Sequence, residues 1–197
     1  MAPLTGSLGL LRCAVSYALS STQLATPERL SWPTPCAGWD LGWLLHHVSD
    51  SLGVLHEALT AGYVGPARGD GGSGTDPAGD LRRRAHALLA ACPPGRHADH
   101  LVAIGDRGLA ARLAVAAGAI EITVHGWDIA AACGSRRPVP PGLAAVLLPI
   151  APLFITPGVR AGLFADPVPV PGPACPGDQL VAFLGRHPRL PAAPGPA

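Results

Sequence analysis

Apolar side chains recur every third or fourth position along much of the chain, a spacing that predicts helices. The clearest pattern follows Asp40, a plausible N-cap, and continues through a leucine-rich stretch to about Leu59. Weaker patterns predict helices over residues 8–24 and about 80–91. The stretch over residues 109–134 is apolar enough to predict a buried helix, although it carries several charged side chains.

Glycine and proline organise the segments between and after these helices. A glycine-rich stretch over residues 62–79 predicts a long crossover connection between the second and third helices. Near the C-terminus, the frequent prolines limit the length of each element. We expect a helix over 143–155 that is kinked near Pro149, an extended stretch over 166–176 and a short helix over 179–185.

The overall pattern predicts an all-α fold, because no stretch shows the two-residue alternation of a strand and no segment repeats. Four principal helices predict a four-helix bundle with a long crossover between helices two and three and an irregular, proline-rich C-terminal extension. The chain has 197 residues, 48% of them hydrophobic, which is the size of one domain. We expect a single domain over residues 1–190 and a disordered tail over 191–197.

Charge and cysteine content exclude several classes of protein. A net charge of +1 with 14% charged residues offers no basic surface for nucleic acid. The five cysteines are odd in number and lack a CxxC pair, which argues against a disulfide framework or a thiolate zinc site. The N-terminus lacks the basic region of a signal peptide, and prolines interrupt the longest uncharged run. We therefore expect a cytoplasmic protein with a small-molecule substrate and neither nucleic-acid nor membrane partners.

Three ionisable side chains, Glu121, His125 and Asp128, lie within eight residues of the helix predicted over 109–134. Residues four apart are neighbours on one helical face, so Glu121 and His125 are able to bind one metal ion together. Because unpaired polar groups are costly to bury, these side chains require partners. Two simpler readings stay open: Glu121 and His125 bond each other or water, and Asp128 bonds nearby backbone instead of orienting His125.

A metal site on this helix needs at least one further ligand from another helix. Six histidines are candidates for it: His46, His47, His56, His86, His97 and His100. Helical phase places His47 on the flank of the leucine-rich face, His46 on the opposite side and His56 nearer the apolar face. Phase alone therefore does not select His47.

Three stretches resemble one known superfamily. PTPCAGWDLGWLLHHV (residues 33–48) resembles a motif of actinobacterial DinB-like proteins, the metal-binding superfamily that includes mycothiol-dependent maleylpyruvate isomerase. EITVHGWD (residues 121–128) is similar to the superfamily's E-x-x-x-H-x-W-D element. GDQLVAFLGRHP (residues 177–188) is similar to the closing motif of one uncharacterised branch, whereas Trp43 stands where the family usually has aspartate.

The resemblance implies a DinB-like bundle whose metal ligands are His47, Glu121 and His125. Two imidazoles and one carboxylate leave an open position, as in catalytic zinc sites, and nickel or iron would accept the same donors. Trp39 and Trp127 are candidates for lining a cofactor pocket, although most such aromatic side chains pack in a core.

Three functions remain open at this point. By resemblance, the protein is a metal-dependent thiol transferase or isomerase, in which the metal stabilises the thiolate of a cofactor such as mycothiol for reaction with a small electrophile. Alternatively, the metal activates water for hydrolysis or proton transfer, with Asp128 or His46 as the base. The third function is a non-catalytic metal-binding or regulatory protein, for which a homodimer is one possible assembly.

Overall fold

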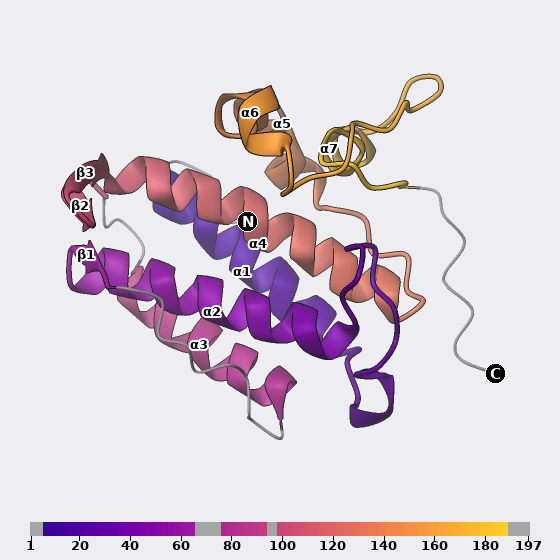
Figure 1. Ribbon diagram of the computed structural model, residues 1–197, viewed down its shortest axis with the longest axis horizontal. Coiled ribbons are helices and arrows are strands. Elements are labelled where there is room, and N and C mark those ends of the chain that lie inside the picture. Colours follow the sequence, from indigo (N-terminus) through magenta and orange to yellow (C-terminus); the bar gives the residue numbers. More distant parts are fainter. Residues whose placement is uncertain (1–5, 66–75, 94–97, 189–197) are drawn as a thin grey trace.

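The computed structural model describes residues 6–65, 76–93 and 98–188, and this part of the chain is mostly helical (Figure 1). Its four longest helices pack against one another. They are α1 (Ser7–Thr22), α2 (Leu41–Thr60), α3 (Pro77–Ala91) and α4 (Ala111–Ala132). Each of the four helices predicted from apolar spacing is confirmed, with ends that move by three residues or fewer.

Helix starts follow the capping chemistry of the sequence. Asp40 caps α2 as predicted, because its carboxylate accepts a hydrogen bond of 2.8 Å from the Trp43 amide. Helix α3 begins earlier than its apolar pattern indicates. Asp76 caps it by accepting from the Gly79 amide, and Pro77 occupies the first helical position.

A small sheet at one end of the helices corrects the expectation that the chain has no strands (Figure 1). Strand β1 (Tyr63–Val64) pairs in parallel with β2 (Leu101–Ile104), which pairs antiparallel with β3 (Arg107–Ala110). The strands are short and mostly exposed, so they lack the alternation that would mark them. A two-residue Gly–Asp turn, with φ of +60° at Gly105, joins β2 to β3 and is the local signal for this hairpin.

The C-terminal part adds three helices along one side of the four long ones (Figure 1). They are α5 (Pro141–Phe154), α6 (Pro157–Arg160) and α7 (Pro176–Phe183). Helices α5 and α7 confirm the predicted elements and pack against each other. Most of the predicted crossover (66–75) and the predicted tail lie outside the described residues.

Helix α4 is the centre of the fold, with side chains buried on nearly all of its faces. Two glycines allow its neighbours to approach closely. A Cβ at Gly126 would lie 3.0 Å from the Ala18 backbone of α1, and a Cβ at Gly118 would lie 2.6 Å from Leu55 of α2. By length and composition α4 is able to span a membrane, but 67% of its most apolar window is buried inside the fold.

Candidate metal centre

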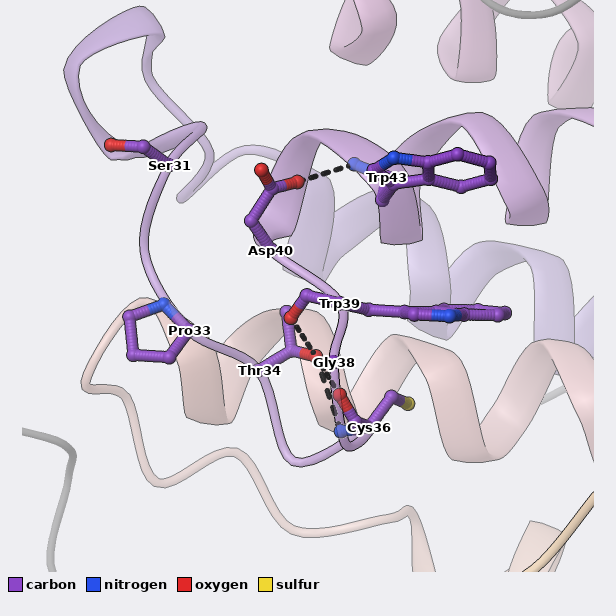
Figure 2. A pocket seen from close by; sticks show the side chains of 8 residues that line it. All are labelled: Ser31, Pro33, Thr34, Cys36, Gly38, Trp39, Asp40 and Trp43. Carbon is purple, nitrogen blue, oxygen red and sulfur yellow. Dashed lines mark hydrogen bonds between the residues drawn. The ribbon is translucent and has the colours of Figure 1, made fainter.

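The loop that precedes α2 places Cys36 and Trp39 against α4 (Figure 2). The Thr34 hydroxyl accepts a hydrogen bond from the Cys36 amide at 3.1 Å and donates one to the Trp39 carbonyl at 2.9 Å. Gly38, with φ of +80°, turns the chain between these two residues. Local hydrogen bonds therefore fix the positions from which both side chains extend.

His47 of α2 and Glu121 and His125 of α4, the ligand set that the resemblance implies, lie close together. One ligand atom from each lies within 4.8 Å of the other two. His47 Nε2 lies 3.1 Å from Glu121 Oε1, and the two imidazole rings meet edge to face with centroids 5.0 Å apart. A tetrahedral zinc ion, with bonds of about 2.0–2.1 Å, holds its donor atoms about 3.3 Å apart. The type and spacing of these donors therefore fit a divalent metal after small side-chain movements.

Glu121 is held by two residues of α2, not by His125. Ser51, one turn beyond His47, donates from Oγ to Glu121 Oε1 at 2.5 Å. Burial tends to raise the pKa of Glu121, but the hydrogen bonds from His47 and Ser51 outweigh burial and hold the pKa below its ordinary value. The carboxylate is thus in its metal-binding form at neutral pH. The side chains of His47 and Glu121 are 35% and 38% exposed, which leaves one side of the cluster open.

His125 is oriented by Asp128, one turn further along α4. Its Nδ1 lies 3.0 Å from Asp128 Oδ2. A carboxylate accepts hydrogen bonds, so Nδ1 carries the hydrogen and Nε2 keeps the lone pair that a metal requires. Asp128 is fully buried, and its contacts are with side chains of other elements as well as His125. The geometry therefore favours an orienting role for Asp128 over a bond to nearby backbone.

Arg186, which follows α7, completes this arrangement and was not identified from the sequence. It donates from Nη2 to Asp128 Oδ2 at 2.8 Å and from Nε to Asp128 Oδ1 at 3.2 Å. Burial tends to raise the pKa of Asp128, but the His125 hydrogen bond and the Arg186 charge outweigh burial and lower the pKa. The sequence signal for it was its place in the closing motif GDQLVAFLGRHP (residues 177–188), in which the arginine was not singled out as a site residue.

Cys36 belongs to a second group of possible metal donors, with His125 and Asp128. Its thiol donates to Asp128 Oδ2 at 3.3 Å and accepts from Arg186 Nη2, also at 3.3 Å. Burial and the charge of Asp128 raise the pKa of Cys36 to about 12, so the sulfur stays protonated. Because a guanidinium already neutralises Asp128 here, this second group is a poor site for a cation.

The remaining candidate residues occupy different places. Trp39 contacts the cluster, with its ring centroid 4.8 Å from that of His47 and 6.4 Å from that of His125. Trp127 packs, partly buried, against the hydrophobic core. His46 is half-buried, and none of the contacts that build the described site involves it.

The other histidines considered as a third ligand lie elsewhere or outside the description. His100 Nε2 lies 3.3 Å from the Ala58 carbonyl, and His86 is exposed on α3. His56 is half-buried nine residues beyond His47 on α2, and it is absent from both groups of possible metal donors. His97 falls outside the described residues.

A cavity of about 320 Å³ lies next to the cluster, in front of the α2 N-terminus (Figure 2). Trp39 lines this cavity and also touches the His47 ring, so it forms a wall that the cavity and the cluster share. Trp43, which is 64% exposed, and the polar side chains of Thr34 and Asp40 are among the other residues that line it. The cavity offers a place for a small molecule close to the candidate metal ligands.

These features define a mostly helical protein with a candidate divalent-metal site between α2 and α4. The chain is similar to two uncharacterized proteins of Mycobacterium tuberculosis, Rv0738 of strain H37Rv and MT0763 of strain CDC 1551. Each is 32% identical over 161 residues, covering 81% of this chain and 86% of the relative. The chain belongs to the family of these mycobacterial proteins. No family model and no solved structure matches it.

Proposed function

We propose that this protein is a DinB-like, divalent-metal-dependent enzyme that uses a low-molecular-weight thiol of the mycothiol type. It would transfer that thiol to a small electrophilic substrate or use it to isomerise one. The observation that carries the proposal is the convergence of His47, Glu121 and His125 on one point between α2 and α4. The mycobacterial relatives agree with the actinobacterial origin that the sequence resemblance implies.

The packing of α1 to α4 is also compatible with the DinB-like four-helix arrangement that we propose. In that arrangement, metal ligands come from facing helices of the bundle. Here His47 comes from α2, whereas Glu121 and His125 come from α4. A cytoplasmic location and a homodimeric assembly remain predictions that accompany this proposal.

The exposure of His47 and Glu121 favours a catalytic site over a purely structural one. Structural zinc sites are closed by four protein ligands, whereas catalytic sites use three and keep one position open. His47 and Glu121 are each about one third exposed. Trp39, whose ring packs against that of His47, also lines the neighbouring cavity.

The residues of the chain would prepare this site by orientation and charge. A divalent metal bound there would stabilise a thiolate or lower the pKa of water. Ser51 holds the Glu121 carboxylate toward His47, and Asp128 fixes the ring of His125. The Trp39 ring packs beside both imidazoles, with its centroid 4.8 Å from that of His47 and 6.4 Å from that of His125.

The disposition of Asp128 favours thiol chemistry over hydrolysis. A general base must reach the proton that it removes. Asp128 is fully buried, and both of its oxygens accept hydrogen bonds from Arg186. A thiol, in contrast, is much more acidic than water and needs less assistance from a base once it lies near a metal.

Metal analysis of the purified protein and its variants tests the proposal. Wild-type protein should bind one zinc, nickel or iron ion, and His47→Ala and Glu121→Ala should lose it. His56→Ala, on the same helix as His47, serves as the matched control and should retain it. Unchanged metal content in both ligand variants would show that the site is wrongly assigned.

The thiol is tested on the cobalt-substituted protein. Addition of mycothiol should produce a sulfur-to-cobalt charge-transfer band, and an electrophile panel should yield a thiol conjugate or an isomerised product. Turnover of an ester or amide without thiol would instead support the hydrolytic alternative. A saturated metal with no turnover of any kind would support a non-catalytic metal-binding protein.

A further inference from the structure

Arg186 is a buried cation that donates hydrogen bonds to other groups of the protein. Its side chain is 8% exposed and bonds both oxygens of Asp128. The guanidinium also donates to Cys36 Sγ at 3.3 Å and to the Leu184 carbonyl at 2.7 Å. It contacts no proposed metal ligand directly, yet Asp128 is bonded to one of them, His125.

We propose that Arg186 is a positioning residue that selects which nitrogen of His125 is available to the metal. This inference rests on the proposed metal site at His47, Glu121 and His125. With both oxygens held by Arg186, Asp128 is fixed as an acceptor at Nδ1 of His125. The proton then stays on Nδ1, and the lone pair of Nε2 remains directed away from Asp128 and available for a metal.

Arg186 also keeps the second donor group, Cys36, His125 and Asp128, from competing for the ion. These three side chains are close enough to bind a metal by themselves. The guanidinium lies against both Asp128 and Cys36, so it supplies the positive charge that a second cation would otherwise bring. Without it, His125 would be free to offer Nδ1 to a metal held by Cys36 and Asp128.

The backbone that follows α7 fixes the position of Arg186. Gly185, with φ of +83°, ends the helix, and the Arg186 amide donates to the Val181 carbonyl at 2.9 Å. A Cβ at Gly185 would lie 2.7 Å from the Ala165 carbonyl oxygen, so no side chain fits there. This segment therefore brings its arginine to a residue of α4 that lies 58 positions earlier in the chain.

Arg160 provides a matched control because it anchors the same segment without touching the site. Its guanidinium donates to the Ala165 carbonyl at 2.6 Å and to the Phe183 carbonyl at 2.9 Å. Removal of Arg160 and removal of Arg186 should both loosen the C-terminal segment. Only the removal of Arg186 should change the environment of His125.

The first experiment uses metal-free protein, so it does not depend on metal binding. Nitrogen chemical shifts of the His125 ring should show a hydrogen on Nδ1 in wild-type protein and in Arg160→Met. In Arg186→Met we expect a mixture of the two neutral tautomers, because Asp128 is no longer held as the acceptor at Nδ1. A His125 ring that keeps its wild-type shifts in Arg186→Met would overturn the positioning role.

The second experiment measures zinc affinity by competition with a chelator, together with the spectrum of the cobalt-loaded protein. Arg186→Met should lower zinc affinity on the order of 10- to 100-fold, as loss of an orienting partner does in other metal sites. Its cobalt spectrum should also change, through a sulfur-to-cobalt band from Cys36. Arg160→Met should match wild type in both measurements.

The two experiments separate this inference from the proposed function. If wild-type protein carries the hydrogen on Nδ1 of His125 but binds no zinc, the proposed function is contradicted, whereas the Arg186–Asp128–His125 geometry is supported. Wild-type zinc affinity and spectrum in Arg186→Met would contradict the inference alone. If Arg186→Met does not fold, Arg186→Lys carries the comparison, because lysine keeps the charge but cannot bridge both oxygens of Asp128.

Discussion

The buried ion pair between Asp128 and Arg186 predicts that stability and metal affinity can be separated by mutation. Asp128 is fully buried and Arg186 is 8% exposed, with contacts of 2.8 Å and 3.2 Å between them. Asp128→Ala leaves an uncompensated guanidinium in the interior, which costs about 3–5 kcal/mol. For a chain of this size that loss lowers Tm by about 6–20 °C.

Replacement of both charges should restore most of this stability. Buried ion pairs are often no more stabilising than apolar side chains of similar volume, so Asp128→Leu with Arg186→Met should fall within about 1–2 kcal/mol of wild type. Zinc affinity should remain lowered by about 10- to 100-fold, because His125 has lost the acceptor that orients it.

Chemical denaturation of the metal-free proteins and chelator competition for zinc provide the two measurements. Asp50→Ala is the control for loss of a carboxylate: Asp50 lies 3.6 Å from Arg84 in an exposed pair, and its removal should cost less than about 1 kcal/mol. Wild-type zinc affinity in the double variant would refute the orienting role of the pair. A destabilisation of less than about 1 kcal/mol in Asp128→Ala would contradict the burial of the Asp128–Arg186 pair.

Three further predictions concern packing, pH and metal binding. Gly126→Ala places a Cβ 3.0 Å from the Ala18 backbone and should cost about 1–3 kcal/mol in thermal unfolding, whereas Gly158→Ala, which meets nothing within 4 Å, should be neutral. Burial raises the pKa of Tyr17, the Arg137 charge opposes this, and the Asp128 charge adds to it. The pKa of Tyr17 in the folded protein therefore lies above the unfolded value of about 10. Its contribution to stability is complete below a pH of about 10 and is lost as the pH rises above that value. Tyr17→Phe should therefore flatten the alkaline unfolding profile, and an equally steep profile would contradict this. Zinc at 100 times its Kd should add about 2.7 kcal/mol, a rise in Tm of about 5–11 °C that a chelator reverses; the same rise in Glu121→Ala would contradict the assigned ligands.

Apolar periodicity was sufficient to predict the helices because each long helix buries at least one continuous face. The predicted ends depended on capping residues that were partly recognised: Asp40 was identified, whereas Asp76 and Pro77 were not. The strands were missed because β1 has two residues and β2 buries only one side chain. Such short, exposed strands depend on pairing partners that local spacing does not reveal.

The candidate site was less accessible to sequence reasoning than the helices. The spacing of Glu121 and His125 places both on one face of α4, but helical phase did not distinguish His47 from His56 as their partner. Resemblance to a known motif pointed to His47, and the fold brings that residue to 3.1 Å from Glu121. Arg186 could not be paired with Asp128 by any periodicity, since 58 residues and three helices separate them.

X-ray absorption of the zinc-loaded, thiol-free protein tests the proposed metal centre most directly. We predict a first shell of two imidazole nitrogens and oxygen donors at about 2.0–2.2 Å, with no sulfur. Glu121→Ala should reduce the oxygen contribution or abolish zinc binding. A sulfur shell at about 2.3 Å, which would place Cys36 on the metal, or a spectrum with fewer than two imidazoles would contradict the site formed by His47, Glu121 and His125.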